Sequence, residues 1–534
     1  MGGAGLGEHG VAGVAAKGRE GWWDGLAGWG RPAMMADADE RDRGSRRGVE
    51  REREEWVMDA AMARNGRNGA VGKKNDEQVA DGRGADAHAA TVEKYRRYVT
   101  TSFVAAIEPV VVARAEGATV WDANGREYVD CFAGIAVVNA GHRHPRVLAA
   151  AREQMERVVH AATYIYHVPV VADLAERLAE ITPTGLDKTF FGNSGAEGIE
   201  TAMRLAKAYT GRHEFITLTH AFHGRTAGTL SITGNKGRKT RGGPYLPGIA
   251  YAPAPYVYRN PFGTDDPETV AERGAEMVEW AVAYPSRGDV AAFIAEPVLG
   301  EGGILVPPAS YFRRVKEVLD RHGILFIADE VQSGFGRTGA LFAIEHFGVT
   351  PDIMVLAKGI ADGFPLSATI ARGEIADSLR PGEHLSTFGG NPVSCAAGLA
   401  NIEVMVEERL PEEAARKGER TLGQLRELAT RHELIGDVRG LGLMIGVELV
   451  TDRGTKEPAS KEAAAVRRLC REAGVLVGVG GQAGNVVRFQ PPLVIEDAAL
   501  ERAVEVLDGA LAEVAGNEDG GRSSRVEAVA ASQG

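Results

Sequence analysis

The fold is decided by two stretches, ILFIADEVQSGFGRTG at residues 324–339 and PDIMVLAKG at residues 351–359. Each begins with an apolar run of strand length and then turns polar, so that Asp329 ends the first run and Lys358 follows the second. Apolar runs of about four to eight residues bounded by turn residues are typical of strands buried in a parallel sheet. Ligands of open α/β sheets bind at the carboxyl ends of the strands. We therefore expect Asp329 and Lys358 to face one crevice.

Four more apolar runs of the same kind accompany this pair. They span residues 188–191, 214–218, 290–295 and 367–371, and longer amphipathic segments lie between them. This alternation predicts an α/β fold. Towards the C-terminus, residues 437–450 and 475–495 have the pattern of strand pieces, joined by a helix over residues 461–473. We expect these to form a second, smaller α/β domain.

The composition restricts the class of protein. Of 534 residues, 44% are hydrophobic and 25% are charged, and the net charge is −12. These values exclude wholesale disorder and argue against nucleic acid as a partner. No stretch approaches about 18 consecutive apolar residues, and no basic segment precedes an apolar run at the N-terminus, so we expect neither a membrane span nor a secretory signal. The widely spaced Cys131, Cys395 and Cys470 fit a reducing cytoplasm better than a disulfide framework.

Residues 1–90 differ in composition from the rest of the chain. They are rich in Gly, Ala and charged residues and contain no Ile or Phe. Such a segment cannot build a core, so we predict a disordered N-terminal extension. Alternatively, translation starts at an internal methionine such as Met58 or Met62. The polar residues 515–534 are likewise expected to form a disordered tail.

The stretch FFGNSGAE at residues 190–197 passes from a predicted strand through small residues into an amphipathic segment. A helix N-terminus with free backbone N–H groups suits a phosphate, although such a stretch alone is more often an ordinary strand-to-helix loop. A lone Asp is often a helix cap, and a lone Lys is usually solvated. Opposite charges at two buried strand ends, however, would not be left unpaired cheaply. Desolvation lowers the pKa of a Lys from its reference value of about 10.4, and the neutral amine is a nucleophile toward an aldehyde.

Six blocks together resemble the class III pyridoxal-phosphate-dependent aminotransferases, in the order of that family. They are NSGAE (193–197), FHGRT (222–226), EPVLGEGG (296–303), the block 329–339, AKG (357–359) and STFGGNP (386–392). The resemblance covers roughly residues 95–514. It implies the fold type I architecture, with a large domain around a mostly parallel seven-stranded sheet and a smaller α/β domain. We assign residues 151–405 to the large domain and residues 91–150 and 406–514 to the smaller one.

The resemblance also implies a cofactor, pyridoxal 5'-phosphate, which acts as an electron sink. Lys358 would bind it covalently and move a proton, and Asp329 would pair with its ring nitrogen. Gln332 would donate a hydrogen bond to the phenolic oxygen, and Phe222 would stack on the ring. The other cofactor-binding residues so implied are Ser194, Gly195 and Ala196 at the phosphate, His223 beside Phe222 at the ring, Val331, and Thr387 reaching the phosphate from the neighbouring subunit.

Substrate-binding residues follow from the same resemblance. Arg488, in NVVRFQPP at residues 485–492, would grip a carboxylate, for which guanidinium geometry is suited, although a single Arg is more often in a surface salt bridge. Glu296 would be a gate that pairs with Arg488 when the donor carries its amine at the far end. Arg225 would meet the distal carboxylate of the substrate. Ile135, in FAGIAV at residues 132–137, would border the pocket and favour slim donors.

The leading hypothesis is an ω-amino acid:2-oxo acid aminotransferase, most like 4-aminobutyrate aminotransferase and using an acceptor such as 2-oxoglutarate. It would work by ping-pong half-reactions in a cytoplasmic homodimer or dimer of dimers, without nucleic-acid or membrane partners. Acetylornithine, ornithine and alanine–glyoxylate aminotransferases are alternatives in the same class. A non-catalytic sensor that keeps the fold is another, although Lys358 and Asp329 argue against it. His142 and His144 lack Cys or carboxylate companions in sequence, so we expect no metal.

Overall fold

The computed structural model describes the backbone of residues 83–102 and 107–531, with side chains described for residues 87–102 and 107–516. The predicted disordered extension therefore lies outside the described residues up to residue 82. Its last part is helical instead, because α2 spans Arg83–Tyr98. The predicted disordered tail also differs, since α14 (Asp497–Ala531) continues through most of it. Neither α2 nor α14 contains a proline, and both contain several alanines, so a helix can propagate through them.

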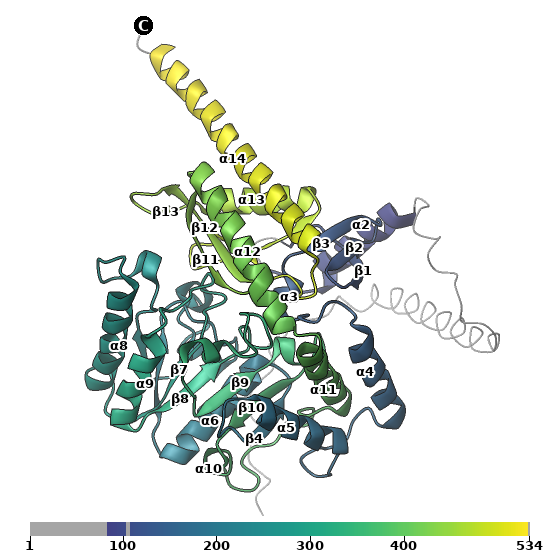
Figure 1. Cartoon of the computed structure of the whole chain (residues 1–534), viewed down its shortest axis with the longest axis vertical. Coiled ribbons are helices and arrows are strands. Elements are labelled where there is room, and N and C mark those ends of the chain that lie inside the picture. The colour runs from purple at the N-terminus through teal and green to yellow at the C-terminus, as the bar shows by residue number, and fades with distance from the viewer. Residues whose placement is uncertain (1–82, 103–106, 532–534) are drawn as a thin grey trace, which may run out of the picture. The chain divides into compact units, whose positions relative to one another are not determined.

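The centre of the fold is a seven-stranded sheet of order β4-β10-β9-β8-β7-β5-β6 (Figure 1). All its pairings are parallel except those of β10, which runs antiparallel to both of its neighbours. This confirms the predicted α/β fold with a mostly parallel seven-stranded sheet. The strands are β4 (Lys188–Gly192), β5 (Glu214–Leu218), β6 (Ile249–Ala252), β7 (Val290–Ala295), β8 (Leu325–Asp329), β9 (Ile353–Leu356) and β10 (Ser367–Ala371).

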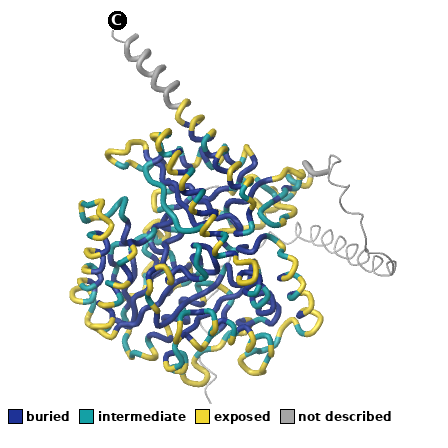
Figure 2. The backbone as a smooth tube through the Cα atoms, in the orientation of Figure 1, coloured by how far each residue is buried: buried dark blue, intermediate teal, exposed yellow. Residues whose placement is uncertain are grey.

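Helices cover both faces of this sheet, because alternate strand residues point to opposite sides. Phe293, Phe326 and Met354 belong to one hydrophobic cluster, and their neighbours Ile294 and Ile327 belong to another. The first cluster is completed by α5 (Pro169–Ile181), α8 (Pro267–Ala283), α9 (Tyr311–His322) and α11 (Pro392–Glu407), and the second by α6 (Gly195–Thr210) and α10 (Gly373–Ala376). The inner strands β7, β8, β9 and β10 are consequently buried along their whole length (Figure 2).

Two smaller sheets lie in the remaining parts of the chain. In the first, of order β1-β2-β3-β14, the strands β1 (Val112–Glu116), β2 (Thr119–Asp122) and β3 (Glu127–Asp130) are joined by β14 (Val475–Leu476). β14 pairs in parallel with β3, so segments from both ends of the chain share this sheet. The second has the order β11-β12-β16-β15, with strands β11 (Ile435–Leu441), β12 (Met444–Asp452), β15 (Gly478–Gly480) and β16 (Val486–Phe489), and β13 (Glu457–Pro458) pairs with β12.

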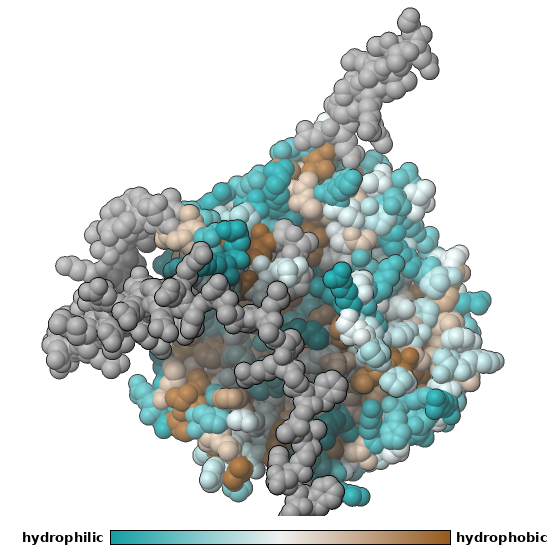
Figure 3. Space-filling model, turned by 180° about the vertical axis from the view of Figure 1, so that it is seen from behind, coloured by the Kyte–Doolittle hydropathy of each residue, from teal (hydrophilic) through white to brown (hydrophobic). Residues whose placement is uncertain are grey.

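A separate hydrophobic cluster holds these smaller sheets to their helices. It includes residues of α12 (Leu410–Arg431), α13 (Ser460–Glu472) and the first part of α14. The helix predicted over residues 461–473 is thus confirmed as α13. On the surface, hydrophilic residues predominate, and hydrophobic ones are scattered among them on the face seen in Figure 3. Among the described helices, none combines the length and apolar character needed to span a membrane.

The register of the large sheet positions the two residues that the sequence singled out. Asp329 is the last residue of β8 and pairs with Val355 of β9. Lys358 follows three residues after Val355, in the turn that leaves β9. Both side chains therefore lie at the same carboxyl edge of the sheet, as expected from the two opening stretches.

Candidate active site

A cavity of about 550 Å³ opens at this edge, between the loops that follow β4, β5, β7, β8 and β9. Most of the residues predicted from the sequence line it. These are Ser194, Gly195, Ala196, Phe222, His223, Arg225, Glu296, Asp329, Val331, Gln332 and Lys358. Ile135, Thr387 and Arg488 are not among its lining residues.

Lys358 begins the short 3-10 turn after β9 with a left-handed backbone conformation, φ 47°. Such a conformation is uncommon for a residue with a side chain and often marks a functional position. Burial lowers the pKa of Lys358, and the negative charge of Asp329 opposes this effect. A lowered pKa favours the neutral amine, which is the nucleophilic form.

Asp329 is almost fully buried and is held by two donors. His223 Nδ1 lies 2.7 Å from Asp329 Oδ2, and the Val331 backbone N–H donates to Asp329 Oδ1 at 3.1 Å. The other ring nitrogen of His223 lies 3.3 Å from the hydroxyl of Thr217 on β5. His223 also lines the cavity, and its contact with Asp329 orients the carboxylate.

The N-terminus of α6 contributes one wall of the cavity. Ser194 caps this helix by accepting a hydrogen bond from the Glu197 backbone N–H at 3.3 Å. A Cβ at Gly195 would lie 2.8 Å from Val331 Cγ1, so only glycine allows the helix to approach the loop after β8 so closely. The unpaired backbone N–H groups and the dipole of this helix end form a site for an anion such as a phosphate.

Gln332 is fixed by a neighbour from the smaller sheets. Its Oε1 accepts a hydrogen bond of 2.8 Å from Gln490 Nε2. A Cβ at Gly300 would lie 2.3 Å from Gln332 Oε1, so the side chain passes against a glycine. With its oxygen engaged, Gln332 keeps its amide N–H groups for a ligand in the cavity.

The predicted pairing of Glu296 with Arg488 is wrong. The Glu296 carboxylate accepts hydrogen bonds of 2.9 Å from the backbone N–H groups of Phe222 and Gly300. Burial raises the pKa of Glu296 to about 7, although His223 and these two donors counteract it. Glu296 directly follows β7, where its side chain holds the adjacent loops and does not pair with Arg488.

Arg488 pairs instead with Glu301, five residues further along the same block. Arg488 Nη1 lies 3.2 Å from Glu301 Oε2, and Arg488 Nη2 donates to the Val479 carbonyl at 3.2 Å. Burial lowers the pKa of Arg488, and Glu301 opposes this effect. Glu301 Oε1 also accepts a hydrogen bond from Arg238 Nη2. Sequence reasoning missed Glu301 and Arg238, although Glu301 stood in the block EPVLGEGG.

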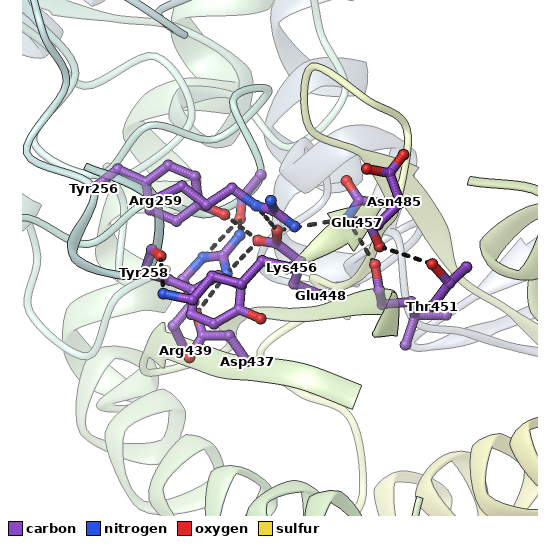
Figure 4. A network of polar contacts seen from close by, with 12 residues as sticks. Tyr256, Tyr258, Arg259, Asp437, Arg439, Glu448, Thr451, Lys456, Glu457 and Asn485 are labelled. Carbon is purple, nitrogen blue, oxygen red and sulfur yellow. Dashed lines mark hydrogen bonds and ion pairs between the residues drawn. The ribbon is translucent and has the colours of Figure 1, made fainter. Parts of the chain in front are cut away.

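A polar network around Arg439 and Glu448 is shown in Figure 4, and Arg439 also binds the loop that carries Glu301. Arg439, on β11, donates to the Gly303 carbonyl at 2.6 Å and pairs with Asp437 at 2.6 Å and Glu448 at 2.8 Å. Glu448, on β12, also binds Tyr256 and Arg259, which flank or belong to the short turn η2 (Val257–Arg259) after β6. Although burial opposes it, the charge of Arg439 lowers the pKa of Glu448, which therefore stays ionised. The network ties the second small sheet to the edge of the large one.

Two predicted residues lie elsewhere. Ile135 is in the left-handed turn of α3 (Ala133–Ala136) with φ 72° and is 42% exposed, and Val137 faces the cavity instead. Thr387 is exposed, in a loop that contributes no lining residue to this cavity. That Thr387 binds the cofactor phosphate in a neighbouring subunit stays a prediction.

The two histidines considered for a metal have other partners. His142 Nε2 lies 2.8 Å from Asp130 Oδ2, and His144 Nε2 lies 3.4 Å from Glu408 Oε1. Within residues 87–102 and 107–516, no group of three or more His, Cys, Asp or Glu side chains is arranged to hold a metal ion.

Comparison with known proteins identifies the family. The model of the family described as aminotransferase class-III matches residues 103–511. The chain belongs to the class III aminotransferases. It is 40% identical to an acetylornithine aminotransferase of Methanothermobacter thermautotrophicus, over 78% of this chain and 97% of that protein. It is 43% identical to a leucine/methionine racemase of Thermococcus litoralis, over 79% of this chain and 95% of the relative.

A solved structure shares the fold of this aminotransferase. An amine transaminase from an uncultivated Pseudomonas species, in its pyridoxal-phosphate-bound form, superposes with a TM-score of 0.75 and 35% sequence identity. The alignment covers 78% of this chain and 99% of the Pseudomonas one. The fold is therefore that of the fold type I transferases, and pyridoxal phosphate is the cofactor of this enzyme.

The cavity fits that cofactor in its chemistry. Lys358 offers a primary amine whose pKa is lowered by burial, and Asp329 offers a carboxylate for a protonated ring nitrogen. The N-terminus of α6, kept free of side chains by Gly195, offers donors to a phosphate. These three features line a single cavity, so they suit one molecule that carries an aldehyde, a pyridine nitrogen and a phosphate.

Proposed function

We propose that this aminotransferase moves the amino group of an ω-amino acid, such as 4-aminobutyrate, to a 2-oxo acid such as 2-oxoglutarate. The two half-reactions would use one site in turn. The observation that carries the proposal is the pairing of the buried Arg488 with Glu301 at 3.2 Å.

The pairing solves a problem of charge. A 2-oxo acid presents a carboxylate next to its reacting carbon, and Arg488 can bind that group in a bidentate manner. An ω-amino acid has no charge beside its reacting carbon, so an unpaired buried arginine would be costly there. Glu301 neutralises Arg488 while the ω-amino acid is bound, and it moves aside when the 2-oxo acid binds. The exposed Arg225 at the cavity wall would bind the distal carboxylate of either substrate.

The residues of the cavity divide the remaining work. When bound, pyridoxal phosphate supplies the electron sink that accepts negative charge as the substrate loses a proton. Lys358 would take that proton at Nζ and return it, and Asp329 would hold the proton of the ring nitrogen. The α6 N-terminus with Ser194, Gly195 and Ala196 would bind the phosphate.

A Glu301→Gln variant tests the proposal. Without the negative charge, Arg488 stays available to a carboxylate beside the reacting carbon, so the preference for ω-amines over α-amino acids should fall by about tenfold or more. The measurement is the rate at which each amine depletes the absorption band of the bound cofactor. The matched control is Glu272→Gln, which removes an exposed charge on α8, away from the cavity, and should leave the preference unchanged. An unaltered preference in Glu301→Gln would contradict the proposal.

Acetylornithine, ornithine and alanine–glyoxylate transfer are the alternatives within the class. They differ in donor and acceptor, and initial rates with each donor in the presence of 2-oxoglutarate or glyoxylate separate them. The highest rate with alanine and glyoxylate would replace the ω-amine proposal. A sensor would bind an amine without releasing an oxo acid.

Amino-acid racemisation is a second candidate, favoured by the 43% identity to the leucine/methionine racemase. A racemase returns the amino group to the same molecule and needs no acceptor. With one enantiomer of leucine or methionine and no 2-oxo acid, a racemase inverts many equivalents, whereas an aminotransferase stops after one equivalent per site. Chiral chromatography of the products distinguishes the two.

We propose further that the enzyme acts as a homodimer. Residues 159–166 lie beside residues 384–391, where Thr163 Oγ1 donates to the Gly389 carbonyl at 2.7 Å. These segments expose the apolar side chains of Ile165, Tyr166, Leu385 and Phe388 around Thr387. Apolar patches of this kind are typical of protein interfaces. Light scattering should give twice the mass of the chain, and Leu385→Glu should halve it.

A cytoplasmic location remains our proposal for this enzyme. Cys131, Cys395 and Cys470 are free and buried, which suits a reducing compartment. Fractionation of cells that express the full chain is the direct test.

A further inference from the structure

Glu301 is held by two arginines at once. Arg488, on β16, approaches Oε2 and is almost completely buried. Arg238, on the short turn η1 (Lys236–Lys239), approaches Oε1 with a side chain that is half exposed. The two cations come from opposite parts of the chain and contact different oxygens of one carboxylate. Either contact can therefore persist when the other is broken.

The position of Arg238 is well defined by its surroundings. Asn235, which is buried, caps the turn by accepting from the Gly237 backbone N–H at 3.0 Å, and the Arg238 backbone N–H donates to the Asn235 carbonyl at 3.2 Å. The Arg238 guanidinium lies 5.7 Å from the centre of the Phe222 ring, a distance at which cation and ring attract each other. Since Phe222 lines the cavity, Arg238 lies beside the wall of the site.

The energetic need for a second cation arises when a carboxylate binds Arg488. Glu301 has a side chain that is only 18% exposed. If Arg488 were its single partner, displacement by a substrate would leave Glu301 poorly solvated, without a counter-ion and close to a like charge. Arg238 removes this cost because Oε1 is already bound to it.

We propose that Arg238 is a positioning residue that retains Glu301 while Arg488 binds the carboxylate of a 2-oxo acid. The inference rests on the proposed role of Glu301 as a gate. The half-reaction with the 2-oxo acid then depends on Arg238. The half-reaction with the ω-amine depends on Arg238 much less, because Glu301 stays paired with Arg488 in that half-reaction.

Equilibrium binding of glutarate to the holoenzyme tests this statement. Glutarate has the carbon chain and both carboxylates of 2-oxoglutarate but no carbonyl group, so calorimetry measures its Kd without turnover. We expect Arg238→Gln to raise this Kd about fivefold, the size of a partly exposed ion pair. Arg238→Lys keeps the charge and should stay within about twofold of the wild type. Lys236→Gln is the matched control, since it removes a charge from the same turn and the described residues give it no ion pair.

A double-mutant cycle with Glu301→Gln distinguishes the role of Arg238 from the role of Glu301 as a gate. Glu301→Gln alone should tighten glutarate binding, because it removes the competitor for Arg488. In that background, Arg238→Gln should have less than about a twofold effect, since no displaced carboxylate needs a partner.

Three results would overturn the inference. An equal effect of Arg238→Gln in both backgrounds would mean that Arg238 binds the dicarboxylate directly. No effect in the wild-type background, with Glu301→Gln still tightening the ligand, would remove the role of Arg238 and leave the gate intact. Failure of Glu301→Gln to tighten glutarate would overturn the gate and the inference together.

Discussion

Replacing Arg439 by Met should release the loop that carries Glu301. Arg439 donates to the Gly303 carbonyl and pairs with Asp437 and Glu448, and Glu448 is 1% exposed. Removing one partner of a buried ion pair typically costs about 3–5 kcal/mol, because the other charge is left behind. Glu448 would keep Arg259 and Tyr256, so we expect the lower end, about 3 kcal/mol.

Urea unfolding of the holoenzyme, followed by circular dichroism, measures this loss as a lower midpoint with an unchanged slope. The matched control is Arg259→Met, which removes the more exposed arginine on Glu448 and should cost about 1 kcal/mol. The released loop should also weaken the contact of Glu301 with Arg488, so the donor preference of Arg439→Met should shift in the direction of Glu301→Gln. Equal midpoints for the Arg439 and Arg259 variants would refute the reasoning.

Three further predictions concern the cavity. Lys358→Ala should abolish the cofactor absorption band near the visible edge and lower transamination by about 10²–10⁴-fold or more, and a persistent band would contradict the role of Lys358. Gly195→Ala should weaken cofactor binding by about 1–3 kcal/mol in a titration of the apoenzyme, because its Cβ would lie 2.8 Å from Val331 Cγ1, and adding Val331→Ala should restore part of the affinity. Burial raises the pKa of Glu296 from 4.5 to about 7. Between pH 4.5 and pH 7 the carboxyl group of Glu296 is therefore protonated in the folded state and ionised in the unfolded state. The stability that this bound proton contributes is lost as the pH rises through that window. Glu296→Gln should therefore gain about 1.4 kcal/mol per pH unit relative to the wild type across that window in urea unfolding, and a pH-independent difference would argue against it.

The large sheet could be predicted from sequence because most of its strands are buried on both faces. Six of its strands stood out as apolar runs bounded by polar or glycine residues. The seventh, β6, was missed, since IAYA at residues 249–252 is short and has prolines close by on both sides. It lies at the edge of the sheet, where pairing with β5 defines it more than its own composition does.

The site was predictable where the chemistry depends on which residue ends a strand or stands in the turn just after it. Lys358 and Asp329 are of this kind, and both line the cavity. The partner of Arg488 could not be predicted, because the sequence does not decide whether Glu296 or Glu301, five residues apart, lies beside it. Only the folded chain shows that Glu296 accepts hydrogen bonds from backbone N–H groups, whereas Glu301 forms the ion pair with Arg488. Arg439 was missed for a similar reason, as its partners come from segments far apart in the sequence.

The parallel pairing of β3 with β14 has a consequence for how the chain folds during synthesis. Val129 pairs with Val475, so the strand that completes the first small sheet leaves the ribosome long after β1, β2 and β3. At translation rates of about 5–20 residues per second, the delay is on the order of tens of seconds. During that time the apolar residues of the early strands have no lasting partner. Nascent chains should therefore be most prone to aggregation, and most dependent on chaperones, until residue 476 has emerged.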